Sequence, residues 1–184
     1  MKSFTASLKR SLCLSAIALG SIFQCAFAGT PVLGFEVGVS TFEQVNAGLA
    51  KKTRVENTGV NKFSNGPMLK TDGSAYEIDG LTEVLYIFDE QKKLMGVVMD
   101  MNKSRFDAIY QFLAPKYKLS EQQRPFVGNQ FARFRTADST IELDAPHMSF
   151  EMSVRYMRND LVQKFKAQSQ AEAAAKKKSE SSKF

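Results

Sequence analysis

His147 is the only histidine of the chain, and it lies near two acids in a stretch that reads as the loop of a β-hairpin. An imidazole can act as a general base, and with Asp144 and Glu151 it can hold a metal ion. One imidazole with scattered carboxylates is a weak ligand set, and a loop histidine more often caps backbone groups. A hydrolase or metal-dependent enzyme centred on His147 is therefore the alternative hypothesis. We predict no cofactor and no metal.

A second candidate site starts at Arg124, where a loop marked by proline and glycine leads into a predicted strand. The segment interleaves arginine with phenylalanine, two residue types used at protein-binding hot spots. The structural alternative is that Arg133 or Arg135 pairs across strands with Glu142 or Asp144. The candidate binding residues of this segment are Arg124, Phe126, Phe131, Arg133 and Phe134.

Met95 and Met99 complete the candidate binding set. They belong to a predicted hairpin, residues 82–88 and 94–101, that is apolar at both odd and even positions. Such a hairpin must be covered on both sides. The cover is either another part of this chain, such as a C-terminal helix, or a partner or second copy that binds a methionine-rich surface.

Two amphipathic helices are predicted to lie on these strands, one over residues 41–52 and one starting near Ser104. In each, a serine stands three residues before an acid, Ser40 before Glu43 and Ser104 before Asp107. A serine hydroxyl can cap the first turn, and the carboxylate favours the positive end of the helix dipole. The similarity of the two stretches predicts a tandem duplication, with convergent amphipathic patterning as the alternative.

The predicted fold class is α+β, a tandem helix-plus-antiparallel-β-meander repeat with both helices on one face of the sheet and a C-terminal helix. A gap-free alignment with an offset of 56 residues pairs Leu85 with Ile141 and Val98 with Val154. In the second half, apolar and charged residues alternate, as expected for a sheet with one face in water. The predicted strands are residues 68–71, 74–78, 82–88, 94–101, 129–136, 140–145 and 149–157. The predicted units are 29–102 and 103–157, followed by 158–184 as a helix with a disordered lysine-rich tail.

The N-terminus has the pattern of a cleaved secretory signal: basic residues, an apolar run and a small-residue site ending at Ala28. Cleavage there would remove both cysteines, so the remaining chain would hold its shape by packing alone. We expect a periplasmic or secreted protein without stable membrane insertion. Its excess of positive charge lies mainly in the first ten residues and from Lys164 onward, which argues against nucleic-acid binding by the folded domain.

The opening of the first helix, residues 38–45 with Leu49, precedes a turn-rich meander, and a second such unit follows. This arrangement resembles the exported modules of the SmpA/OmlA outer-membrane assembly lipoproteins and of the tandem-repeat β-lactamase inhibitor proteins. The chain differs from them in having Ala50 where a glycine often closes the helix, and in lacking the inhibitors' disulfides. The resemblance implies the helix-plus-meander fold and a binding role, and assigns no role to any single residue. We therefore expect a non-enzymatic protein that binds a partner in the cell envelope or a secreted hydrolase, and that can also form a homodimer.

Overall fold

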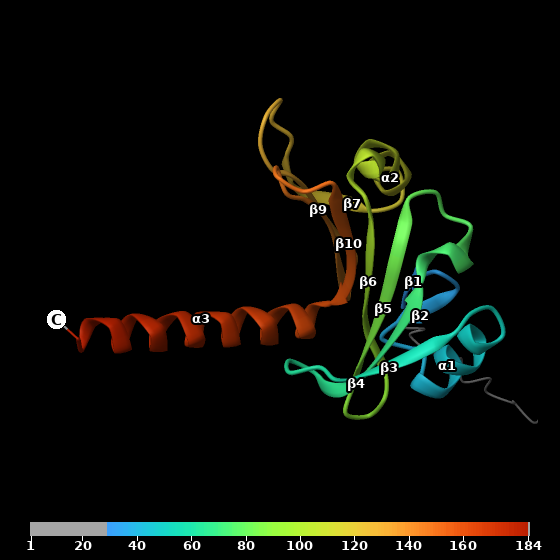
Figure 1. Cartoon of the computed structure of the whole chain (residues 1–184), viewed down its shortest axis with the longest axis horizontal. Coiled ribbons are helices and arrows are strands. Elements are labelled where there is room, and N and C mark those ends of the chain that lie inside the picture. The colour runs from blue at the N-terminus through green and yellow to red at the C-terminus, as the bar shows by residue number, and fades with distance from the viewer. Residues whose placement is uncertain (1–28, 184) are drawn as a thin grey trace, which may run out of the picture.

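The computed structural model describes residues 29–183 and is built on a large antiparallel sheet with the strand order β3-β4-β5-β6-β10-β9-β8-β7 (Figure 1). The predicted α+β class with a C-terminal helix is confirmed. The predicted signal segment, residues 1–28, lies outside the described residues. No helix of the described part is long and apolar enough to cross a membrane. In chain order the elements are β1 (Thr30–Val32), β2 (Phe35–Val37), α1 (Phe42–Ala50), β3 (Val55–Val60), β4 (Asn65–Asp72), β5 (Leu81–Asp89), β6 (Leu94–Asn102), α2 (Phe106–Leu113), β7 (Lys118–Gln123), β8 (Gln130–Arg135), β9 (Ser139–Ala145), β10 (Glu151–Arg158) and α3 (Asn159–Ser181).

The strands predicted from apolar patterning match β4, β5, β6, β8, β9 and β10 to within a few residues. The strand predicted over residues 74–78 is wrong, because Gly73–Tyr76 forms a 3₁₀ turn. Asp72 caps this turn by accepting a hydrogen bond from the Ser74 amide at 2.8 Å. Local bonding by an aspartate side chain competes with strand pairing, which is why the turn forms here.

Strands β3 and β7 were not predicted, and they form the two edges of the sheet. Their sequences, VENTGV and KLSEQQ, are mostly polar, and nearly all of their residues are exposed. Alternation of apolar and polar residues identifies a strand only when one face is buried. These two strands form because β4 and β8 offer unpaired backbone groups, which is tertiary information.

Neither predicted serine cap, Ser40 or Ser104, forms at its α-helix in the described structure. In α1 the cap is Thr41: its hydroxyl accepts from the Gln44 amide at 3.3 Å, and the Gln44 side chain accepts from the Thr41 amide at 2.9 Å. This reciprocal pair is a capping box, and it starts the helix one residue later than predicted. Helix α2 has no side-chain cap, since a 3₁₀ turn over Lys103–Arg105 leads into it.

One side of the sheet carries the main core. Strands β5, β6, β9 and β10 supply most of it, including the fully buried Tyr86 and Leu143. Helices α1 and α2 contribute to the same cluster through Val45, Leu49, Phe106 and Leu113, and the β1-β2 hairpin adds Val32 and Val37. Two short helices and one hairpin therefore contribute residues to this core in addition to the strands (Figure 1).

The opposite side of the first four strands carries a smaller group, which we call the outer cluster. It is closed by the start of α3, whose Leu161 is buried against β6. Phe165, one turn further on, packs against Phe63 in the loop between β3 and β4. The two rings are in an edge-to-face arrangement with their centres 4.9 Å apart. Beyond this base α3 leaves the sheet and stays helical to Ser181 with exposed side chains (Figure 1). The members of the outer cluster are Ile87, Met95 and Leu161, with Phe63, Met68, Leu85 and Val98 packed against them.

The tail beyond Gln168 was expected to be disordered, and the structure instead continues the helix through it. Alanine, lysine, glutamine and glutamate all favour helix even without an apolar face to bury.

The offset of 56 residues between the two halves is also wrong. It pairs Leu85 of the outer cluster with Ile141 of the main core, which lie on opposite faces of the sheet. Because side chains alternate along a strand, a one-residue error exchanges the faces. Any alignment of β6 with β10 that preserves faces needs an odd offset.

Candidate functional site

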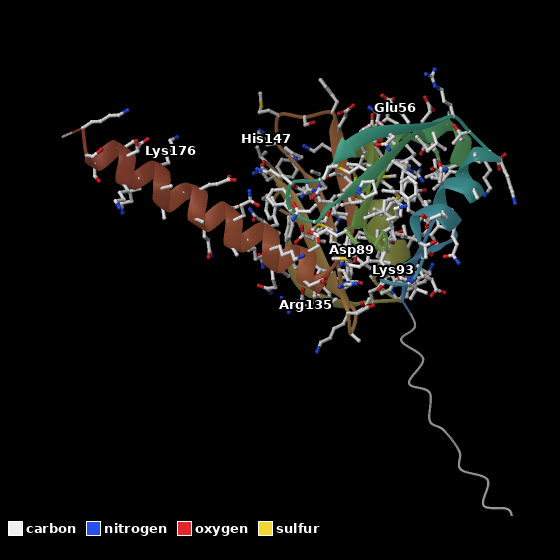
Figure 2. All side chains as sticks on the ribbon, turned by 90° about the horizontal axis from the view of Figure 1, so that it is seen from below. Glu56, Asp89, Lys93, Arg135, His147 and Lys176 are labelled. Atoms are coloured by element: carbon white, nitrogen blue, oxygen red, sulfur yellow. The ribbon has the colours of Figure 1, made fainter. Side chains whose placement is uncertain are left out.

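The predicted enzymatic set is not brought together. Asp144 accepts a hydrogen bond from Arg155 at 3.1 Å, and no hydrogen bond joins the His147 imidazole to Asp144 or Glu151 in the described structure. His147 lies at the surface (Figure 2), in the loop between β9 and β10. Within residues 29–183 no group of three histidine, cysteine or acidic side chains is placed to hold a metal ion.

Arg133 is part of a row of charges that crosses four adjacent strands, which we call the charge ladder. Glu121, Arg133, Glu142 and Arg155 are successive cross-strand neighbours on β7, β8, β9 and β10. Arg133 donates to Glu142 at 2.7 Å and also to Glu121, while Arg155 reaches Glu142 at 3.9 Å. Of the predicted structural pairings of Arg133 or Arg135 with Glu142 or Asp144, the structure forms the one between Arg133 and Glu142. Opposite charges directly across a sheet stabilise the strand register.

Phe131, Phe134, Met95 and Met99 do not form a free surface either. Phe134 is fully buried in the main core, and Phe131 lies under the Arg133 guanidinium at 4.8 Å. Met95 is 1% exposed beneath the base of α3, and Met99 is buried on the opposite face. The apolar hairpin is thus covered on both sides by other parts of this chain.

Arg124 holds the β7-β8 loop against α2. Its guanidinium is hydrogen-bonded to Asp107 in the first turn of α2 and lies 5.0 Å from the centre of the Tyr110 ring. The side chain is half-buried, and aromatic stacking adds to the ion pair. Arg124 therefore positions the loop that follows it.

That loop and its neighbour expose the largest apolar side chains of this end of the sheet. Phe126 is fully exposed, Phe150 is 92% exposed and Met148 is 91% exposed, with Val127 also exposed. We call these four residues the tip patch. They lie in the β7-β8 and β9-β10 loops, which are adjacent because β8 pairs with β9 (Figure 1).

Polar contacts fix both loops of the tip patch. Asn129 accepts a hydrogen bond from the His147 amide at 2.8 Å, which ties one loop to the other. The Lys103 ammonium donates to the His147 carbonyl at 3.2 Å, and the Lys103 amide donates to the Phe150 carbonyl at 2.8 Å. Gly128 has a φ of +133°, which permits the loop shape. The apolar side chains are therefore presented by loops with defined backbones.

Of the seven candidate binding residues, Phe126 and Arg124 are exposed, and Arg124 is already engaged by Asp107 and Tyr110. Met148 and Phe150 were not predicted as binding residues. Met148 falls in the predicted loop that contains Pro146, and Phe150 falls in the predicted strand 149–157. The signal that could have found them is the presence of two large apolar residues in a hairpin turn, where polar residues are expected. Comparisons of the chain with protein-family models, with curated proteins and with solved structures gave no match.

Proposed function

We propose that this chain is an exported, non-enzymatic binding protein that contacts an envelope or secreted protein partner through the tip patch. The observation that carries the proposal is the exposure of Phe126, Met148 and Phe150 on two loops that are tied to each other and to α2. Exposed aromatic side chains on pre-organised loops are suited to protein binding, since little conformational freedom is lost on contact. The enzymatic alternative lacks comparable support, because Asp144 is already paired with Arg155.

The proposal includes a tandem architecture. Each half is one helix followed by four strands in a meander, α1 with β3 to β6 and α2 with β7 to β10. The halves meet at β6 and β10, which run antiparallel, as a two-fold relation between them requires. This order supports a duplicated module in which each helix lies over its own meander, and a relation in fold to the SmpA/OmlA and β-lactamase-inhibitor modules. Export would place the module in the periplasm or outside the cell.

The test is co-purification from a bacterial envelope extract with wild type, Phe126→Asp and Phe150→Asp. The matched control is Val60→Asp, which changes an exposed apolar residue on edge strand β3. Each tip variant should lower partner recovery by about tenfold or more, as expected for a hot spot, while the control and all melting temperatures stay near wild type. Equal recovery by wild type and both tip variants would contradict the proposal.

Light scattering on the same variants identifies one special case. If the wild type is a dimer that Phe126→Asp converts to a monomer, the protein partner is a second copy of this chain.

A further inference from the structure

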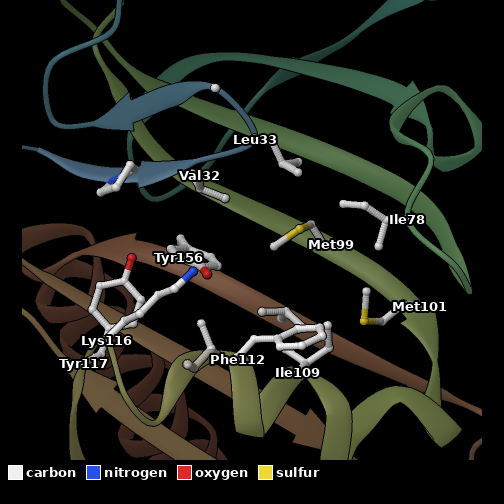
Figure 3. Close-up of a pocket in the computed structure, with 14 residues that line it drawn as sticks. Val32, Leu33, Ile78, Met99, Met101, Ile109, Phe112, Lys116, Tyr117 and Tyr156 are labelled. Carbon is white, nitrogen blue, oxygen red and sulfur yellow. The ribbon is translucent and has the colours of Figure 1, made fainter.

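The main-core side of the sheet contains a pocket of about 410 Å³ between α2 and the β1-β2 hairpin (Figure 3). Its floor is made by β6 and β10 and its walls by residues from both flanking elements. This volume lies in the lower part of the range for small-molecule sites, roughly 300–1,000 Å³. The pocket is separate from the tip patch and shares no residue with it. The apolar lining includes Val32, Ile78, Met99, Met101, Ile109 and Phe112.

The two ends of this pocket differ in chemistry. Lys116, Tyr117 and Tyr156 gather at one end, while Ile78, Met101 and Ile109 lie toward the other (Figure 3). None of its lining residues is acidic. The pocket is therefore an apolar cavity with a cationic and hydroxyl-bearing end.

The polar groups at that end are without partners in the described part of the chain. Neither the Lys116 ammonium nor the Tyr117 and Tyr156 hydroxyls take part in a hydrogen bond or ion pair within residues 29–183. Tyr156 is only 8% exposed, but its hydroxyl oxygen is not fully buried, so a bound hydrogen-bond acceptor would replace water there. Burial raises the pKa of the Tyr156 phenol, with a contribution from nearby Tyr117, so it remains a proton donor at neutral pH. A ligand that accepts hydrogen bonds would satisfy these donors.

The surface beside this end adds positive charge. Lys118 on β7 and Arg135 on β8 are direct cross-strand neighbours, and like charges in this position repel each other. Both border the same surface hollow as Lys116. The acid in that hollow, Asp138, already accepts hydrogen bonds from the hydroxyls of Thr30, Thr136 and Ser139. An anionic group bound beside Lys116 would reduce the repulsion between Lys118 and Arg135.

We propose that this pocket binds a small amphiphile with one anionic head, an aliphatic carboxylate of medium chain length. The carboxylate lies at Lys116 and accepts from the two tyrosine hydroxyls, and the hydrocarbon chain lies along Met99 and Met101. Methionine side chains adapt to ligands of irregular shape, and Phe112 at the rim is exposed until a chain covers it. This binding site is independent of the proposed protein contact.

The test is calorimetric titration of the purified protein with decanoate, and with decanol and decylamine as head-group controls. Decanoate should bind saturably with one site per chain, and decanol and decylamine should each bind weaker by about tenfold or more because a charge-assisted hydrogen bond is lost. Octanoate and dodecanoate test the length of the pocket. No saturable binding of any of the three carboxylates, or decylamine binding as tightly as decanoate, would overturn the proposal.

Lys116→Ala supplies the residue-level test, because Lys116 is exposed and its truncation leaves the core intact. It should weaken decanoate binding by about tenfold and leave decanol binding unchanged. Lys51→Ala is the matched control, with the same change in charge at an exposed position that lines neither this pocket nor the hollow beside it. Equal decanoate affinities for wild type and Lys116→Ala, or an equal loss in both lysine variants, would contradict the assigned head-group site.

Discussion

The first and second halves of the sheet present different chemistry on the same face. In the first half this face is the apolar outer cluster, and the base of α3 covers it through Leu161 and Phe165. In the second half it carries the charge ladder, in which each arginine is paired with two acids. An apolar face must be covered, whereas an alternating row of paired charges is stable in contact with water.

The comparison explains why α3 packs on only one half. Gly96 of β6 lies beneath Leu161, and a Cβ there would stand 3.5 Å from the leucine methyl group and 3.1 Å from the Tyr156 carbonyl. The corresponding face of β10 presents Arg155, which the ladder already uses. The helix base therefore has one apolar surface available to it, and the rest of α3 projects away from the sheet (Figures 1 and 2).

The largest effect should come from opening the covered half. Met95→Ala removes a fully buried side chain beneath α3 and should lower the free energy of unfolding by about 2–5 kcal/mol. Met148→Ala is the control, since the same residue change at a 91% exposed loop position should cost less than about 0.5 kcal/mol. Urea denaturation measures both. Similar losses in the two variants would show that the outer cluster is not packed as described.

Breaking the ladder should have a smaller effect. Glu142→Ala leaves the guanidinium groups of Arg133 and Arg155 with one acid each and should cost about 1–3 kcal/mol. Glu121→Ala removes the exposed end of the same row and should cost less than about 1 kcal/mol. The two unfolding free energies, measured by urea denaturation, distinguish the positions. A larger loss for Glu121→Ala would mean that the ladder is not anchored at Glu142.

The helices of the two halves begin differently, which allows a third test. Thr41→Ala removes the capping box of α1 and should lower stability by about 1 kcal/mol. Ser104→Ala should change it by less than about 0.5 kcal/mol, because the Ser104 hydroxyl makes no cap in the described structure. Thermal melts monitored by circular dichroism compare the two. Equal losses would restore the equivalence that the sequence pattern suggested.

The smallest effect on stability is expected at Asp100. This residue lies on β6, the strand of the first half that pairs with β10 of the second half. Burial raises the pKa of Asp100 above its ordinary value of 3.8, and Glu83 and Glu151 add to the shift, while Arg155 and Lys70 oppose it. A raised folded-state pKa means that the folded protein binds the proton more tightly, so stability falls as pH rises from the ordinary value through the raised one. Asp100→Asn should therefore raise the melting temperature at pH 7 and raise it less at pH 3. A lower melting temperature at pH 7 would reverse the sign.

Local sequence predicted the interior of the sheet well. Strands β9 and β10 alternate apolar with charged residues, which correctly separated residues of the main core from Glu142 and Arg155, whereas β5 and β6 are apolar at both odd and even positions. It also limited the partners of Arg133 to Glu142 and Asp144, because charges on consecutive strands meet across a hairpin, and the register of β8 with β9 selects Glu142. These features depend on residues close together in the chain.

The candidate sites were harder to predict for a physical reason. Phe126 was identified from its neighbours in sequence. Met148 and Phe150 join it in one patch only because the pairing of β8 with β9 places their loops side by side. Phe134 and Met95 are of a type that suits binding, and only packing shows that they are buried. Exposure is a property of the assembled chain.

The sequence by itself determined the α+β class, the positions of the central strands and two candidate acids for Arg133, because each follows from side-chain patterns over a few residues. The tertiary structure decided which polar segments became edge strands and where α3 settles. It also brought Val32, Met99, Ile109 and Tyr156 from four elements into one pocket. Those outcomes depend on backbone groups and surfaces that come together only when distant segments pack, and no local pattern records them.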